Sequence, residues 1–154
     1  MYRLVILFFL IGCQTSTSEI KSVQLNNFDE IYFNVVEKNM INKTNLPNKM
    51  NLLINEWFNK IKVNGFQGNV LFEITQYNEI ISDISNGKKI ELKLRMNVNI
   101  DTDDKFLKKK DLKIDLNEYG TITGNFSLND FDNLIFDTQK NLIKSLTKTL
   151  RSQI

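Results

Sequence analysis

Histidine is absent from this chain of 154 residues, and cysteine, tryptophan and proline each occur once. Without histidine, the sequence has no side chain that combines the commonest general base, the commonest zinc ligand and a switch near neutral pH. A single cysteine excludes an internal disulfide. Lysine and arginine number 20 against 18 acidic residues, so net charge indicates neither nucleic-acid binding nor strong attraction to anionic lipid.

The most specific signal lies at the start of the chain. Arg3 gives a positive beginning, residues 4–11 are uninterrupted apolar residues, and Gly12 precedes Cys13. This order is typical of a secretory signal peptide. Eight residues of helix span about 12 Å, whereas a membrane-spanning helix needs ~20 residues, so we expect no permanent transmembrane helix here. An ordinary signal peptide with a coincidental cysteine is the alternative interpretation.

The segment Leu10-Ile11-Gly12-Cys13 resembles the lipobox of bacterial lipoproteins. That resemblance implies a diacylglyceryl group on the Cys13 thiol and cleavage just before it, so residues 1–12 would be the signal peptide. Residues 13–27 then read as a lipidated tether, and residues 28–154 as one α+β domain. Gln14 after the cysteine resembles lipoproteins sorted to the outer membrane, which implies a lipid-anchored protein facing the periplasm.

Hydrophobic periodicity predicts the elements of this domain. Residues 90–101 alternate apolar and polar side chains without a fault, as in a strand covered on one face only. Asn86-Gly87 before it is a hairpin signal, and Ser127 with Asp130 resembles a capping box. Asn45 is a candidate cap of the first helix, and Gly120 and Gly124 are candidate sites of a bend or bulge. The expected strands are residues 31–36, 70–81, 90–101 and 112–117, and the expected helices are residues 47–62 and about 128–152.

The order β-α-β-β-β-α predicts an α+β, two-layer sandwich. We expect a four-stranded, mostly antiparallel sheet with two helices on one face. The buried stripe of the last helix should include Leu128, Phe131 and Ile135. The polar stretch of residues 37–45 is expected to connect the first strand to the first helix.

The loop of residues 102–110 is the candidate contact site. It combines two apolar residues with basic residues, a mixture suited to a polar surface with an apolar interior. A solvated charged loop is the alternative interpretation. Nearby, Asp101 begins an acidic run, but Phe106 and Leu112 stand where a calcium loop needs glycine and glutamate, so we expect no metal site. The residues assigned to a partner or lipid contact are Phe106, Leu107, Lys108, Lys109 and Lys110.

Catalysis has few candidates in this composition. The acidic pairs Asp103 with Asp104 and Asp130 with Asp132 are the remaining acid–base options, and nothing in the sequence indicates a pocket around them. We therefore expect a non-enzymatic protein without cofactor or catalytic residue. The polar side of the sheet is either solvated cross-strand pairing or a partner surface, and it carries Glu91, Lys93, Arg95, Lys113 and Asp115.

The lipobox, the tether and this order of elements together look like the lipopolysaccharide-assembly lipoproteins of the LptE kind. They are also similar to auxiliary lipoproteins of lipid-transporting ABC systems. Trp57, the turn of residues 65–68 and the strand from Val70 resemble small unassigned envelope lipoproteins of alphaproteobacteria. The first likeness implies an accessory of outer-membrane assembly with a β-barrel partner, and the second implies a transport complex. A carboxylate-based envelope hydrolase is the remaining alternative.

Overall fold

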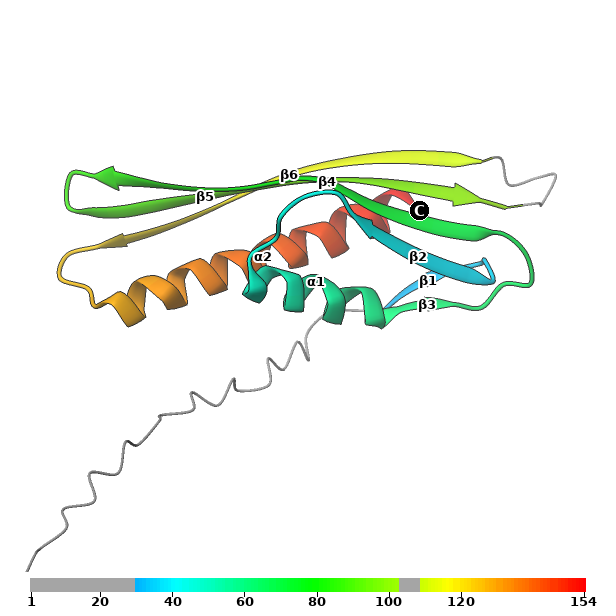
Figure 1. Cartoon of the computed structure of the whole chain (residues 1–154), viewed down its shortest axis with the longest axis horizontal. Helices are drawn as coiled ribbons and strands as arrows, with labels where there is room; N and C mark the ends of the chain where they lie inside the picture. The colour runs from blue at the N-terminus through cyan, green and yellow to red at the C-terminus, as the bar shows by residue number, and fades with distance from the viewer. Residues whose placement is uncertain (1–29, 103–108) are drawn as a thin grey trace, which may run out of the picture.

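A computed structural model describes residues 30–102 and 109–154 (Figure 1). Within these residues the chain forms six strands and two helices. They are β1 (Ile31–Phe33), β2 (Glu37–Asn42), α1 (Asn48–Lys60), β3 (Ile61–Val63), β4 (Asn69–Ile84), β5 (Gly87–Asp101), β6 (Lys110–Thr123) and α2 (Leu128–Gln153).

The main sheet has four strands in the order β2-β4-β5-β6. β2 runs parallel to β4, while β4–β5 and β5–β6 are antiparallel. Both helices lie on the same side of this sheet (Figure 1). The predicted class is therefore confirmed: an α+β fold with a four-stranded, mostly antiparallel sheet and two helices on one face.

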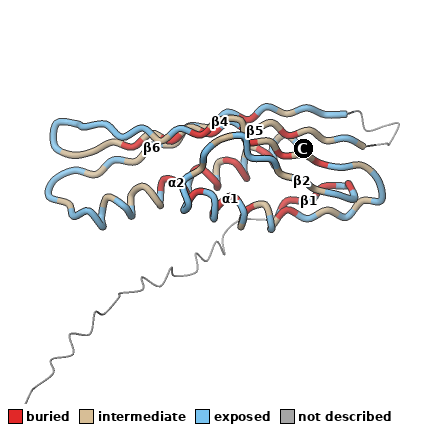
Figure 2. Tube along the Cα trace, in the orientation of Figure 1, coloured by how far each residue is buried: buried red, intermediate tan, exposed pale blue. Residues whose placement is uncertain are grey.

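The hydrophobic core lies between the sheet and the helices, as the buried segments in Figure 2 show. On β5 the predicted alternation is confirmed, because Leu92, Leu94 and Met96 are buried while Arg95 is exposed. A shift of the register by one residue would reverse the two faces. The apolar positions of the strand thus decide which face the helices cover.

One aromatic cluster joins two strands and both helices in the core. The Phe72 ring on β4 makes edge-to-face contacts with Phe33, Trp57 and Phe58, at centroid separations of 5.6, 5.6 and 5.8 Å. The indole Nε1 of Trp57 on α1 donates a hydrogen bond of 3.1 Å to the hydroxyl of Thr147 on α2. The cluster therefore connects β1, β4 and both helices.

Helix α2 begins with the predicted capping box. The Asp130 backbone N–H donates to the Ser127 hydroxyl at 3.2 Å, and the Ser127 backbone N–H donates to the Asp130 carboxylate at 2.9 Å. Twenty-six residues of helix correspond to about 39 Å, enough to follow the sheet lengthwise. Leu128, however, is exposed, which corrects its place in the predicted stripe: it is the first residue of α2 and lies beyond the core.

The beginning of the domain differs from the sequence prediction. The first strand of the main sheet is β2, which lies in the stretch predicted to be a connection. β1 instead pairs in parallel with β3 in a separate two-stranded sheet. The sequence of β2 is polar, and its basic residue Lys38 has a defined role in the structure. Its ammonium donates to the carbonyls of Phe58 and Ile61 at 2.7 and 2.6 Å, and thereby satisfies groups at the end of α1.

Two smaller expectations are also corrected. Pro47 is the N-cap residue of α1, without a side-chain cap, so the assignment of Asn45 was wrong. The irregularity in the sheet lies between Ile74 and Gln76 on β4, whereas β5 and β6 pair without a shift past Gly120. Gly120 lies where α2 approaches closely, since a Cβ there would clash with the Thr138 hydroxyl.

Candidate functional site

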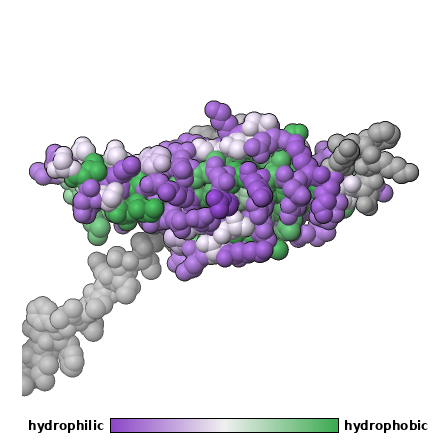
Figure 3. Space-filling model, turned by 90° about the horizontal axis from the view of Figure 1, so that it is seen from above, coloured by the Kyte–Doolittle hydropathy of each residue, from purple (hydrophilic) through white to green (hydrophobic). Residues whose placement is uncertain are grey.

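The face of the main sheet opposite the helices is a broad polar surface. No described element covers it, and Figure 3, which looks onto this side, shows mostly hydrophilic side chains. We call it the open face. Its side chains are the polar partners of the buried alternation, and on β5 and β6 they are Glu91, Lys93, Arg95, Asn97, Lys113, Asp115, Asn117 and Tyr119.

Ion pairs order the charges of the open face. Arg95 and Asp115 are directly opposite in the β5–β6 register, and their Nε and Oδ1 atoms are 2.5 Å apart. Lys93 Nζ lies 2.8 Å from the Glu91 carboxylate. Because both pairs are exposed to water, each adds little to stability. Their effect is to fix an alternating pattern of charge that a partner could match.

A shallow hollow interrupts this face at the β-bulge. Thr75 is the extra residue of β4 between the pairs Ile74–Met96 and Gln76–Arg95, and a bulge of this kind increases the local twist. The hollow has a volume of about 380 Å³ and is polar at its rim. It is lined by Gln76, Lys93, Leu94, Arg95, Asp115, Leu116 and Asn117.

Two carboxyl groups of the open face, those of Glu73 and Glu91, are held in their charged form. A hydrogen bond from Lys43 is the main cause that lowers the pKa of Glu73, and Asn97 adds a second hydrogen bond at 3.4 Å. Lys93 likewise lowers the pKa of Glu91, and the Glu91 carboxylate raises the pKa of Lys93. Neither carboxyl is therefore held protonated as a general acid would be.

These shifts predict a dependence of stability on acidity. The pKa of Glu73 is lower in the folded chain than its usual 4.5, so its stabilising effect is complete above that pH and disappears as the pH falls through the folded pKa. We expect Glu73→Gln to lower the melting temperature slightly at pH 7, with the difference from the unchanged chain vanishing towards pH 3. Thermal melts in steps between these values measure it.

The matched control removes the cation instead. In a Lys43→Gln background the main cause of the shift is gone, so Glu73→Gln should have a much smaller effect on the pH profile. An equal effect of Glu73→Gln in both backgrounds would contradict the assignment of the shift to Lys43.

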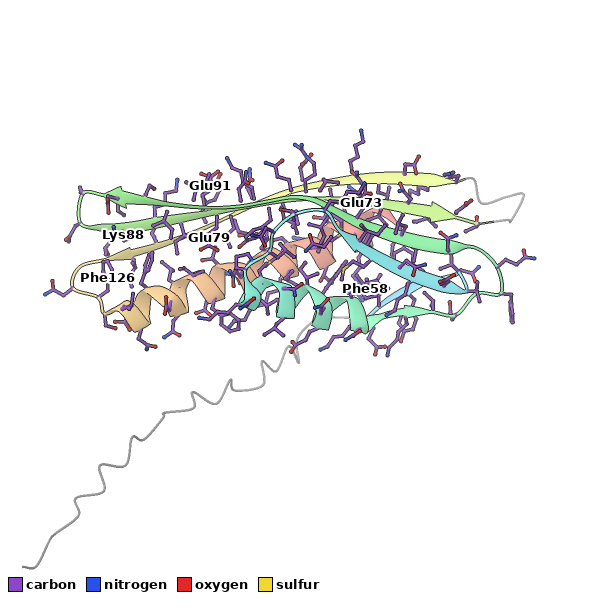
Figure 4. All side chains as sticks on the ribbon, viewed as in Figure 1. Phe58, Glu73, Glu79, Lys88, Glu91 and Phe126 are labelled. Atoms are coloured by element: carbon purple, nitrogen blue, oxygen red, sulfur yellow. The ribbon has the colours of Figure 1, made fainter. Side chains whose placement is uncertain are left out.

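The structure brings together the five residues that the sequence placed on the polar side of the sheet, either as solvated cross-strand pairs or as a partner surface. Glu91, Lys93, Arg95, Lys113 and Asp115 all lie on the open face. In Figure 4 Glu91 points away from the sheet on this side, whereas Glu79 lies on the side of the helices.

The predicted contact loop is described only at its end. Cys13, Phe106, Leu107 and Lys108 lie outside the described residues, so the lipidation site and the loop tip stay predictions. Lys109 and Lys110 are exposed, and the Lys110 ammonium donates to the Gln153 carbonyl near the end of α2.

Asp130, one member of the acidic pair on α2, has a structural role. Hydrogen bonds from Ser127 lower the pKa of Asp130, so this carboxylate caps the helix and complements its dipole. Asp103 and Asp104 lie outside the described residues. In residues 30–102 and 109–154, no group of three or more acidic or cysteine side chains is arranged to hold a metal ion.

A buried polar cluster between β4 and α2 was not predicted. The Tyr77 hydroxyl donates to the Glu79 carboxylate at 3.1 Å, and Gln139 Nε2 lies 3.4 Å from both groups. Burial is the main cause that raises the pKa of Tyr77, so the phenol stays protonated and donates. The sequence signal for this cluster is the apolar series at 70, 72 and 74, which resumes at 77 and so reveals the bulge.

The class defined by this geometry is a two-layer α+β domain with a closed helical side and an open polar sheet. No family model matches the chain, and no curated protein matches it. Among solved structures, rare lipoprotein B from Shewanella oneidensis is similar with a TM-score of 0.51 and 8% identity, over 77% of this chain and 96% of that one. At this identity the likeness shows the fold, which is lipoprotein-like.

Two further solved structures have lower scores. A minor lipoprotein from Acinetobacter baumannii has a TM-score of 0.48 and 11% identity, over 78% of this chain and 92% of that one. A lipoprotein B from Nitrosomonas europaea has a TM-score of 0.45 and 9% identity, over 77% of this chain and 84% of that one. No helix in the described part of this chain is both long and apolar enough to cross a membrane.

Proposed function

We propose that this protein is an envelope lipoprotein, anchored through Cys13 in the outer membrane and facing the periplasm. It acts without catalysis, as an accessory in outer-membrane or lipopolysaccharide assembly. The observation that carries the proposal is a combination: a lipobox at Leu10-Ile11-Gly12-Cys13 on a chain with the fold of rare lipoprotein B. The tether and the fold of the domain agree with the same class of protein.

The open face supports the accessory role, because it offers a broad polar surface with charges already paired in place. The two helices and the small sheet of β1 and β3 close the other face of the main sheet (Figure 1). The described part of the chain begins on that closed side, since Glu30 precedes β1 and its carbonyl lies 3.4 Å from Arg151 Nη2 on α2. An anchor on the closed side leaves the open face directed away from the membrane, towards a partner.

The anchor is tested by Cys13→Ala in the full chain. We expect the unchanged protein to incorporate radiolabelled fatty acid and to sediment with outer membranes, and the variant to lose both properties. The thiol is the group that receives the lipid, so Cys13→Ser should fail in the same way. Membrane retention of Cys13→Ala, together with an unlabelled parent protein, would overturn the lipoprotein assignment.

The partner is tested by site-specific photocrosslinking in cells. A crosslinking residue at Lys93 on the open face should capture an outer-membrane β-barrel protein, identified by mass spectrometry. Lys144, an exposed residue on α2, is the matched control on the helical side and should capture much less. Capture of an ABC permease or its binding protein from Lys93 would replace this role with that of a transport auxiliary. Equal capture from both positions would contradict the open face as the contact surface.

A further inference from the structure

The far half of β4 has no neighbour on one side. β2 pairs with β4 only as far as the pair Asn42–Ile74, and beyond it β4 pairs with β5 alone. Residues 75–84 therefore form a free sheet edge of ten residues within the described part of the chain. Unpaired backbone groups along such an edge are a template for another strand.

This edge is much less protected than the other free edges of the sheet. Along β6 charges lie between its first residue and Glu118, at Lys110, Asp111, Lys113, Asp115 and Glu118. β2 is short and carries Glu37 and Lys38. Lysine, proline and short length are among the usual protections of an edge, as are bulges and inward-pointing charges. Of these, residues 75–84 have the bulge at Thr75 and the carboxylates of Glu79 and Asp83.

By contrast, residues 75–84 contain neither lysine nor proline. Three isoleucines are exposed there instead: Ile80 at 43%, Ile81 at 47% and Ile84 at 37%. Figure 3 shows hydrophobic side chains gathered towards the end of the molecule where the β4–β5 turn lies. The composition of this edge favours pairing with another strand.

The direction of the backbone groups follows from the pairing before the bulge. The Ile74 carbonyl accepts a hydrogen bond from the Lys43 backbone N–H, so this inward-facing residue directs its backbone towards the β2 side. In a strand of fixed direction, side-chain face and backbone direction alternate together. After the bulge the inward-facing residues are odd-numbered, beginning with the buried Tyr77. Tyr77, Glu79, Ile81 and Asp83 thus direct their N–H and C=O groups to the free edge.

We infer that this edge binds the same edge of a second copy of the chain, as an antiparallel pair centred on Ile80. In that register Glu79 lies opposite Ile81, and Tyr77 lies opposite Asp83. Every residue whose backbone groups point to the free edge therefore lies opposite another such residue. Centring the pair on residue 79 or 81 would place Glu79 opposite Glu79 or Asp83, and like charges directly opposite are destabilising. Of these three registers, the one centred on Ile80 is thus the one in which no two carboxylates are directly opposite.

Space for the added strand exists where the edge begins. The connection between β2 and α1 passes beside β4 there and leaves an open hollow of about 410 Å³. It is lined by Asn45, Pro47, Tyr77, Asn78, Glu79 and Ile80. The end of the second copy's β4 enters this hollow.

The symmetry of the pair agrees with a tethered protein. In this pair the inward-facing residues of one copy lie opposite the inward-facing residues of the other. The two-fold axis is therefore perpendicular to the sheet, and the two four-stranded sheets join into one sheet of eight strands. Both helical sides then face the same direction, and Glu30, the first described residue of each copy, lies on that side (Figure 1). Two lipid anchors could enter one membrane without strain. The pairing itself stands whether or not the proposed function holds.

Cysteine crosslinking in the full chain tests the pair. At the centre of the register the two Ile80 residues form a non-hydrogen-bonded pair with Cα atoms about 4.5 Å apart, within the range of a disulfide. We expect Ile80→Cys, after oxidation in membranes, to give a species of twice the chain mass on a non-reducing gel. Asn117→Cys, exposed on β6, is the matched control, and with the unchanged chain it should stay at single mass.

A second variant tests the same contact without a covalent bond. Ile80→Lys places two ammonium groups opposite each other, so detergent-solubilised protein should shift from dimer to monomer in sedimentation, while its circular dichroism spectrum and membrane fraction stay unchanged. Equal crosslinking of the two cysteine variants, no crosslink from Ile80→Cys, or a crosslink to a different protein would each overturn the pairing. The Cys13→Ala experiment tests the anchor alone, whatever its result. Failure of the anchor and failure of the pairing are therefore distinguishable.

Discussion

Replacing Phe72 with alanine is expected to lower the free energy of unfolding by about 3–5 kcal/mol, the usual cost of removing a large buried aromatic side chain. Phe72 is fully buried at the centre of the aromatic cluster. Its ring contacts the rings of Phe33, Trp57 and Phe58, so the cavity would open between β1, α1 and β4. Urea titration followed by circular dichroism measures the loss.

Phe66→Ala is the control, since Phe66 is 98% exposed and the same change should shift stability by no more than about 0.5 kcal/mol. If the two variants proved equally stable, the aromatic cluster would not be the centre of the core.

The second large effect is expected at Gly68, which precedes β4. Its φ of +80° is a left-handed conformation, which costs a non-glycine residue about 1–3 kcal/mol. A Cβ there would also clash with the Asp101 carbonyl and lie 2.9 Å from the Thr102 Cα, both of them backbone atoms that cannot rotate away. We therefore expect Gly68→Ala to destabilise the fold by more than the conformational cost alone, in the same urea titration.

Gly124 supplies a matched comparison. Its φ is +79°, but a Cβ there would have no neighbour within 4 Å. Gly124→Ala thus carries the conformational cost without the clash, and the difference between the two alanine variants isolates the contact of Gly68 with the end of β5. Equal losses in the two variants would mean that the chain relaxes freely around residue 68.

The parts of the fold that were predictable have local causes. The alternation on β5 follows directly from one buried and one wet face. A hairpin joins β4 to β5 where Asn86-Gly87 predicted one, although the two turn residues are Ser85 and Asn86 and Gly87 already pairs with Ile84. The capping box of α2 is equally local, because Ser127 and Asp130 satisfy each other within one turn.

The parts that were missed depend on groups far apart in the sequence. Lys38 points inward because the end of α1, twenty residues later, offers carbonyls to its ammonium. The partner of β1 is β3, a segment whose first two residues continue the helical pattern of α1. For the open face, the alternation predicted which residues share it. That Arg95 lies opposite Asp115 depends on the register between β5 and β6, which the alternation does not determine.

The contact between Trp57 and Thr147 has a practical consequence for optical work on this protein. Because the chain has one tryptophan, all of its indole emission comes from a single buried position where α1 meets α2. Separation of the two helices would expose the indole to water and move its fluorescence to longer wavelengths. The molecule thus contains an intrinsic, label-free probe of helix docking, which reports on one contact rather than on the average of many.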